Sequence, residues 1–155
     1  MSTSPLTSAI LIGLELPGQS AALLAAHLDE LAALAQTAGF AAVERLTQKR
    51  EHPDPGLYVG RGKAEEITAL LEEKNIHWIL CDDELSPSQQ VNLEKETGAR
   101  VLDRALLIIE IFARRAKSRE ARTQVELARM EYLLPRLRKM WSHLERQSGG
   151  IGARG

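Results

Sequence analysis

The chain has 155 residues, of which 44% are hydrophobic and 26% are charged, a balance typical of one globular domain with or without a smaller appendage. Its single cysteine excludes an intramolecular disulfide, and its low aromatic content, 4%, argues against an aromatic platform that stacks single-stranded bases. The N-terminal segment has no basic region and only a short apolar run, which predicts neither a signal peptide nor a membrane span and favours a cytoplasmic location.

Charge is divided unevenly along the chain. Residues 1–103 contain 8 Lys and Arg against 16 Asp and Glu, a net charge of −8, whereas residues 104–155 contain 12 against 5, a net charge of +7. Such an asymmetry indicates that the basic part contacts nucleic acid or another polyanion. The densest cationic run extends from Arg114 to Arg122 and contains one acid, Glu120.

The pattern of residues 1–102 predicts an α/β subdomain with a small, mostly parallel sheet flanked by helices. Short apolar runs predict strands, and apolar residues three or four positions apart predict helices. The expected strands span 9–16, 40–48, 57–60, 77–81 and 99–102, and the expected helices span 20–37, 60–75 and 86–97. Because parallel strands need a long crossover connection, this alternation indicates a sheet with helices on its faces.

Individual residues mark the ends and buried faces of these elements. Ser86 and Gln89 are placed to form a capping box around Pro87 at the first helical position, and Gly98 is expected to end that helix. The run at 40–48 alternates polar and apolar residues like an edge strand. The residues expected to face inward from the first two helices are Leu24, Leu28, Leu31, Ala35, Ile67, Leu70 and Leu71.

Residues 103–147 predict a second subdomain, an antiparallel two-helix coiled-coil hairpin. Asp103 is suited to cap a first helix of about 13 residues, roughly 20 Å long, and a second helix is expected to run to about Arg146. Apolar residues recur at spacings of three and four on both helices. These seams consist of Leu102, Ala105, Ile109, Phe112 and Ala116, and of Leu127, Met130, Leu134, Leu137, Trp141 and Leu144. Pro135 predicts a bend where the second helix leaves its partner and crosses back onto the acidic subdomain.

Five cations crowd the expected turn of this hairpin, and the sequence shows neither a packing role nor enough neighbouring acids for them. They are Arg114, Arg115, Lys117, Arg119 and Arg122, with Ser118 among them. Cations on a projecting tip gain affinity for phosphate by releasing counterions, without reading the base sequence. We therefore interpret the tip as a polyanion-binding site in preference to a merely solvated face.

Two glycine-containing segments match nucleotide-binding loops only in part. Residues 150–155 have the letters of G-x-G-x-x-G, but they follow an expected helix, whereas a dinucleotide loop follows a strand. Gly60, Gly62 and Lys63 begin an expected helix whose amides suit an anion, although the first glycine and the magnesium-binding Ser or Thr of a P-loop are missing. The alternatives there are an isolated anion site and a tight strand-to-helix turn.

The acidic segment Asp82, Asp83 and Glu84 follows an expected strand, which is the usual mouth of an α/β site. Such carboxylates can hold a metal or act as acid and base, but no histidine is close in sequence to assist them. The four histidines share no ligand spacing, so zinc has no support. Cys81 lies in an apolar run and is expected to be a buried, reduced thiol.

Three segments strongly resemble the N-terminal region of the HflX-type GTPases. They are YVGRGKAEEI at 58–67, CDDELSPSQQVNLEKETGARVLDR at 81–104 and QVELARMEYLLPRLRKMWSHLERQSGGIGARG at 124–155. The resemblance implies a domain that binds the large ribosomal subunit and its RNA and that helps to split or rescue stalled ribosomes. Carried over by position, residues 114–122 form the tip that enters near the peptidyl transferase centre. Arg136, Arg138 and Lys139 are a second expected contact, with RNA or with another domain.

In that family a P-loop GTPase domain follows the glycine-rich run. The resemblance implies that residues 148–155, with Gly149, Gly150, Gly152 and Gly155, form a linker toward a GTPase domain that holds GTP and Mg²⁺. Because the chain shows no Walker A, switch or base-specificity motif, we expect no catalytic residue, metal or cofactor in it. We expect a monomer whose partners are the ribosome and its own GTPase domain. The alternatives are a coiled-coil module that binds an acidic protein and a small metal-dependent enzyme that uses residues 82–84.

Overall fold

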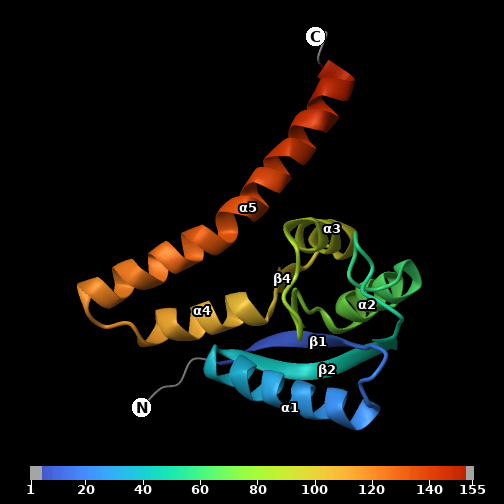
Figure 1. Cartoon of the computed structure of the whole chain (residues 1–155), viewed down its shortest axis with the longest axis horizontal. Helices are drawn as coiled ribbons and strands as arrows, with labels where there is room; N and C mark the ends of the chain where they lie inside the picture. The colour runs from blue at the N-terminus through green and yellow to red at the C-terminus, as the bar shows by residue number, and fades with distance from the viewer. Residues whose placement is uncertain (1–4, 153–155) are drawn as a thin grey trace.

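The computed structural model of the chain describes residues 5–152, apart from the side chains of residue 140 and residues 142–152. Its elements, in chain order, are β1 (Thr7–Glu15), α1 (Ala21–Thr37), β2 (Phe40–Lys49), α2 (Arg61–Lys74), β3 (Trp78–Cys81), α3 (Pro87–Thr97), β4 (Arg100–Leu102), α4 (Arg104–Arg115) and α5 (Arg119–Gly152). Figure 1 shows α1 on one side of the sheet, α2 and α3 on the other, and α5 as a long arm beyond α4. No helix in the described range has both the length and the apolar character that a membrane crossing requires.

The strands of residues 5–152 form one parallel sheet in the order β2-β1-β3-β4. The central strand β1 is buried on both faces: Ile10 and Ile12 pack in a core with α2 and α3, and Ala9 and Leu11 pack in a core with α1 and α4. A strand buried in this way has no position for a polar side chain, which explains its continuous apolar run. The parallel α/β fold and the edge position of β2 are confirmed.

The edge strand β4 has its outward backbone groups occupied by side chains of α3. The amide of Val101 donates to Glu94 Oε2 at 2.8 Å, and the carbonyl of Val101 accepts from Gln90 Nε2 at 3.0 Å. Burial raises the pKa of Glu94 above its ordinary value, although the Val101 amide and nearby Arg100 act in the opposite direction. The hydrogen-bonding groups that Val101 presents away from β3 are therefore satisfied within the chain.

The helix ends agree with the capping residues in the sequence. Ser86 Oγ accepts from the Gln89 amide at 3.1 Å, and Gln89 Oε1 accepts from the Ser86 amide at 2.9 Å, which completes the capping box. Asp103 caps α4 by accepting from the Leu106 amide at 2.9 Å. Gly98 has φ +77°, the left-handed conformation that ends α3.

The prediction of a strand at residues 57–60 is wrong, because this segment forms a loop. Tyr58 has φ +72°, a left-handed conformation that a strand residue cannot adopt, and it pairs its backbone only with Asp54 in an isolated bridge. The loop is closed by Asp54 Oδ2, which accepts from the amides of Gly56 and Leu57 at 3.0 and 2.7 Å. The local turn chemistry of this segment therefore overrides the apolar pattern.

Helices α4 and α5 form the expected antiparallel pair, but the expected coiled-coil seam of α5 does not form. Arg129 of α5 pairs with Glu110 of α4 at 3.0 Å, and α5 passes beyond the end of α4 (Figure 1). The seam residues of α5 are between 42% and 61% exposed, and they form a stripe of Leu127, Met130, Leu134, Leu137 and Trp141, which we call the α5 stripe. The side chain of Leu144 lies outside the described residues. The packed face of α5 includes Val125, Tyr132 and Arg136 instead.

α5 also differs from the sequence expectation near its end. Pro135 lies inside the helix, and the direction of α5 changes along its length in Figure 1, as the proline predicted. The helix continues to Gly152, so Gly149, Gly150 and Gly152 belong to α5 rather than to a linker, whereas Gly155 lies outside the described residues.

Candidate nucleic-acid interface

The turn between α4 and α5 projects the five cations of the tip. α4 ends at Arg115 and α5 begins at Arg119, and Ser118 fixes the turn because its Oγ accepts from the Ala121 amide at 3.0 Å. The tip cations Arg114, Arg115, Lys117, Arg119 and Arg122 are all exposed. Within residues 5–152, no ion pair joins any of them to a described carboxylate. The tip is thus a concentration of positive charge that the described part of the chain leaves unneutralised.

One of these cations also has a structural contact that the sequence did not reveal. Arg114 Nη1 donates to the carbonyl of Ala38 at 3.4 Å, beyond the C-terminal end of α1. Gly39 has φ +97°, and Arg114 Nη1 lies 2.7 Å from the position that a Cβ on this glycine would occupy. Arg114 and Arg115 also lie in the last turn of α4, where the helix dipole stabilises a cation. Arg114 therefore links the tip to the α/β subdomain.

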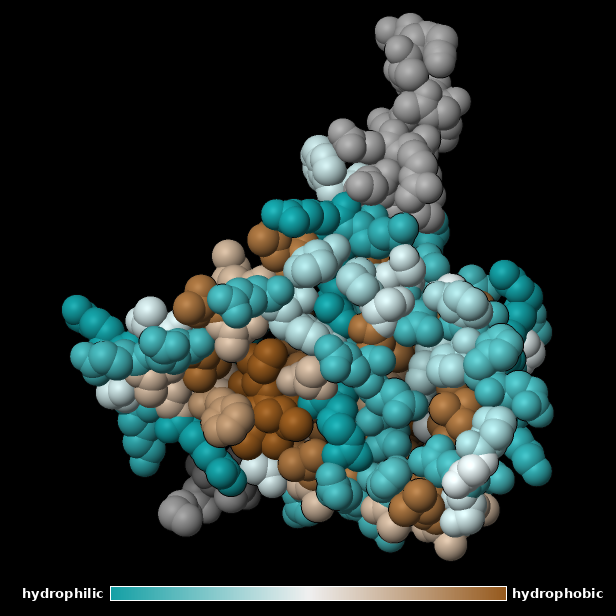
Figure 2. All heavy atoms as spheres, in the orientation of Figure 1, coloured by the Kyte–Doolittle hydropathy of each residue, from teal (hydrophilic) through white to brown (hydrophobic). Residues whose placement is uncertain are grey.

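An apolar groove separates α4 and α5 directly behind the tip. Its volume is about 420 Å³. The lining residues are Ile109, Phe112, Arg115, Ala116, Ala121, Gln124, Val125 and Ala128. Figure 2 shows hydrophobic side chains gathered over α4, where Ile108 and Phe112 are the exposed large ones. Small side chains on α5 leave this space open, which explains why the helices lie side by side without a filled seam.

A buried cluster of polar groups joins α5 to the α/β subdomain; its members are Gln90, Asp103, Tyr132 and Arg136, and we call it the α5 anchor. Asp103 is fully buried, and its Oδ2 accepts from the Leu85 amide at 2.9 Å, from the Tyr132 hydroxyl and from Arg136 Nη2 at 3.4 Å. Burial, together with the hydrogen bond to Asp103, raises the pKa of Tyr132. The cap of α4 is therefore also the acceptor that holds α5.

Arg136 completes the α5 anchor. Its guanidinium lies 3.8 Å from the centre of the Tyr132 ring and donates to Gln90 Oε1, to the Leu85 carbonyl and, at 3.1 Å, to the Tyr132 carbonyl. Only 7% of Arg136 is exposed, which corrects its expected place in a surface contact. Arg138 is exposed and Lys139 is half-buried, so these two residues remain available to a partner.

The candidate anion site at the start of α2 is already occupied by the chain's own groups. The Gly60 amide donates to Gln48 Oε1 at 2.8 Å, and Lys63 pairs with Glu66 at 3.0 Å. Gly62 has open space around it. A Cβ on Gly60 would lie 2.9 Å from Arg50 Nη1, the end of a flexible side chain that could shift to make room for it. The geometry is that of a tight turn into a helix.

Two of the three acids after β3, Asp82 and Asp83, form internal contacts, whereas Glu84 is exposed. Asp82 pairs with Arg104 at 2.5 Å, and Arg104 also pairs with Glu30 at 2.6 Å. Asp83 accepts from the Tyr58 hydroxyl at 2.6 Å. Among the described side chains, no group of three or more His, Cys, Asp or Glu is placed to hold a metal ion. The arrangement therefore gives no support to a metal-dependent enzyme at residues 82–84.

Cys81 is fully buried, and burial raises the pKa of its thiol well above the ordinary value. The sequence expectation of an unreactive thiol therefore agrees with the environment of this residue.

Known proteins resemble this chain over nearly its whole length. Residues 25–113 match the family described as GTP-binding GTPase N-terminal, and residues 115–155 match GTP-binding GTPase Middle Region. The chain is 52% identical to GTPase HflX of Flavobacterium psychrophilum over 146 residues, which are 94% of this chain and 35% of that protein. It is 45% identical to GTPase HflX of Escherichia coli K12 over 128 residues, 83% of this chain and 30% of that protein. The chain thus spans about a third of the length of these curated relatives.

Solved structures support the same relationship. A GTP-binding protein from Sulfolobus solfataricus, in complex with GDP, matches with a TM-score of 0.69 and 25% identity, covering 96% of this chain and 44% of that one. A variant of the protein named SsGBP, G235S, matches with a TM-score of 0.70 and 27% identity, over 87% of this chain and 41% of that one.

Proposed function

This chain belongs to the HflX family of GTP-binding GTPases, and from this premise we propose that it is the part that binds the large ribosomal subunit through its basic tip. The observation that carries the proposal is the unneutralised charge of the tip cations at the turn between α4 and α5. Phosphate contacts of this kind position a protein on RNA without reading its sequence. In the full protein this contact would contribute to ribosome splitting or rescue in the cytoplasm.

The hairpin suits this role because both of its helices contact the α/β subdomain. The α5 anchor attaches α5 to the buried cap of α4, and Arg114 attaches the end of α4 to α1. A tip that is fixed at two points loses little conformational freedom when it enters a confined RNA cavity. The tip would therefore act as a rigid pointer whose position the α/β subdomain sets.

We assign GTP and Mg²⁺ to the remainder of the longer protein. The relatives named GTPase HflX are about three times as long as the matched region, and residues 1–155 contain no P-loop pattern. The 155-residue chain is therefore expected neither to bind nor to hydrolyse GTP. Isothermal titration calorimetry tests this expectation, and a micromolar affinity for GTP would contradict it.

The α5 stripe supports a second contact, with the GTPase domain of the longer protein. Five large apolar residues stand exposed on α5, and the exposed Arg138 and half-buried Lys139 lie beside them. Several large apolar side chains exposed together on one helix are typical of interaction surfaces. If Trp141 is covered by that domain, its fluorescence emission in the full-length protein will be blue-shifted relative to the 155-residue chain. Equal emission in the two proteins would contradict the contact.

Binding of purified large ribosomal subunits tests the role of the tip. In the triple variant Arg115→Gln, Lys117→Gln and Arg119→Gln, Arg114 is retained because it has a structural contact. Each lost phosphate contact lowers the slope of log affinity against log salt by about 0.7 to 0.9, so the slope should become shallower by roughly 2 to 3. The melting temperature should be unchanged or slightly higher, since these cations repel one another.

A matched control removes the same charge elsewhere. The variant Arg45→Gln, Arg61→Gln and Lys74→Gln also loses three cations, each of which is paired with a carboxylate of the α/β subdomain. It should bind subunits with the parental salt slope. If both triple variants lose affinity equally, net charge and not the tip governs binding. If an acidic protein competes with ribosomal RNA for the tip at equal concentration, the alternative of a protein-binding module is favoured.

A further inference from the structure

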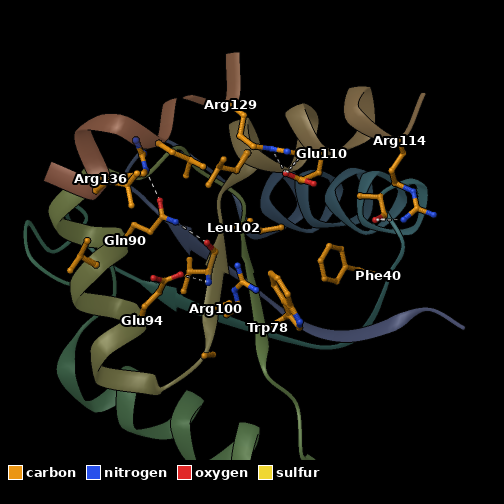
Figure 3. A pocket seen from close by; sticks show the side chains of 17 residues that line it. Phe40, Trp78, Gln90, Glu94, Arg100, Leu102, Glu110, Arg114, Arg129 and Arg136 are labelled. Atoms are coloured by element: carbon orange, nitrogen blue, oxygen red, sulfur yellow. Dashed lines mark hydrogen bonds and ion pairs between the residues drawn. The ribbon is translucent and has the colours of Figure 1, made fainter. Parts of the chain in front are cut away.

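A second concave site lies beside the tip, where β4, α3, α4 and α5 meet. This cavity has a volume of about 660 Å³, within the range of roughly 300–1,000 Å³ that is typical of small-ligand sites. Figure 3 shows Phe40, Trp78 and Arg100 along one wall, with Arg129 and Glu110 on the opposite side. None of the sequence motifs pointed to this cavity, because its lining comes from six separate elements and the segments between them.

Two aromatic rings and two guanidinium groups line one side of the cavity. The rings of Phe40 and Trp78 are 5.1 Å apart and meet edge to face at 61°. Arg100 lies over the Trp78 ring, 4.8 Å from its centre. Arg114 lines the same cavity and lies against Gly39, which is the residue before Phe40. This edge-to-face pair of rings therefore has Arg100 beside Trp78 and Arg114 beside Gly39, next to Phe40.

The charges of the cavity favour an anion. Arg129 is neutralised by Glu110 at 3.0 Å, and Arg136 pairs with buried Asp103. Within the described residues, neither Arg100 nor Arg114 forms an ion pair with a carboxylate. The remaining acid in the lining, Glu94, accepts from the Val101 amide and lies near Arg100. The four arginines of the lining outnumber its two acids, Glu94 and Glu110, so the net charge of the site is positive.

We propose that this cavity binds one unpaired nucleotide of an RNA strand, with the base stacked against Trp78 and Arg100 and the phosphate bound by Arg114. Single-stranded RNA is recognised by stacking its splayed bases on aromatic rings and on guanidinium planes, with cations along the backbone. The inference rests on the proposed function, because Arg114 belongs both to the tip and to the cavity and so makes one continuous RNA-binding surface. The apolar remainder of the lining, which includes Leu106 and Leu133, suits the base and sugar.

Trp78 fluorescence reports occupancy of the cavity directly. The chain has two tryptophans, and Trp141→Phe leaves Trp78 as the single reporter. The probe is a labelled single-stranded RNA of about ten nucleotides, within the site size of one single-strand-binding fold, and the same strand annealed to its complement is the comparison. Anisotropy of the label measures binding, and tryptophan emission measures stacking. We expect both RNAs to bind and the single strand alone to quench Trp78.

Two variants separate stacking from folding. Trp78→Leu should weaken single-strand binding about 5- to 150-fold, the range that loss of one base–aromatic stack produces. Because Trp78 contributes to the core, Arg100→Gln is the second variant: Arg100 is exposed, so the fold should be retained while binding and quenching are weakened. Arg61→Gln, on α2, is the matched control and should change neither signal.

The outcomes distinguish this inference from the proposed function. Single-stranded RNA that binds by anisotropy without changing Trp78 emission, or that binds Arg100→Gln as it binds the parent, would overturn the cavity assignment and leave the tip intact. Absence of RNA binding would overturn both. A nucleoside monophosphate that quenches Trp78 when RNA does not bind would show that the ligand is a free nucleotide and would overturn RNA as its source.

Discussion

Replacing Arg136 with methionine should detach α5 from the α/β subdomain. Methionine keeps the length and apolar character of the side chain but removes every donor that Arg136 supplies to the α5 anchor. Asp103 would remain fully buried with the Leu85 and Leu106 amides and the Tyr132 hydroxyl as its donors, whereas Gln90 Oε1 and the Leu85 carbonyl would each lose a hydrogen bond. The substitution therefore breaks a buried charge pair from one side.

The expected cost follows from this geometry. Removing one partner of a buried ion pair typically costs about 3–5 kcal/mol, because the other charge is left buried and uncompensated. The donors that remain on Asp103 place the expected loss near the lower end of this range. For a chain of this size, each kcal/mol corresponds to about 2–4 °C, so a loss of about 3 kcal/mol should lower the melting temperature by roughly 6–12 °C.

Thermal unfolding and hydrogen exchange together test this prediction. The matched control is Arg138→Met on the same helix, where Arg138 is exposed and the loss should stay within about 0.5 kcal/mol. Exchange should become faster for the amides of α5 around Tyr132 and change less for those of β1. Equal stability losses in the two variants, or faster exchange confined to β1, would show that the α5 anchor does not hold the helix.

Three further predictions concern other parts of the fold. Leu137→Asp should lower the free energy of unfolding by less than about 1 kcal/mol in denaturant, because Leu137 is 54% exposed. Leu107→Asp, at a fully buried position, should cost several kcal/mol or prevent folding. Equal losses from the two variants would support the predicted coiled-coil seam. Glu94→Gln should keep or raise the free energy of unfolding at pH 7, since glutamine still accepts from the Val101 amide and burial disfavours the carboxylate. Glu94→Ala loses this acceptor and should cost about 1 kcal/mol. A loss from Glu94→Gln as large as that from Glu94→Ala would contradict this explanation. Because the pKa of Tyr132 is raised in the fold, its stabilising contribution should be complete below about pH 10, the ordinary tyrosine value, and should be lost at higher pH. In Tyr132→Phe the free energy of unfolding should therefore fall less steeply with pH above about pH 10. An unchanged dependence of stability on pH would refute the role of Tyr132.

Local features of the sequence predicted most of the α/β subdomain. Ser86, Gln89 and Gly98 predicted the ends of α3 because capping depends on residues within one turn of the helix end. The apolar run in β1 predicted a buried strand because a central parallel strand is covered on both faces. Tyr58 was assigned wrongly because a positive φ depends on the hydrogen bonds of Asp54 in the folded loop, which an apolar pattern does not reveal.

Contacts between distant residues were beyond the reach of the sequence. The α5 anchor joins Asp103 to Tyr132 and Arg136, and the cavity brings Phe40 and Trp78 near Arg114 from three elements. Leucines at spacings of three and four on α5 match a coiled-coil seam, but that pattern states only that one face is apolar, and not what covers it. Arg136 was grouped with surface cations for the same reason, because its buried partners lie 33 and 46 residues away.

Both edge strands of the sheet have features that oppose pairing with a strand of another molecule. An unpaired strand edge can template the addition of a strand from another copy. Here Gln90 and Glu94 bind the outward backbone groups of Val101 on β4, and β2 carries three charged residues, Glu44, Arg45 and Lys49. Both edge strands therefore offer few free backbone groups or uncharged surfaces on which a strand of another copy could pair.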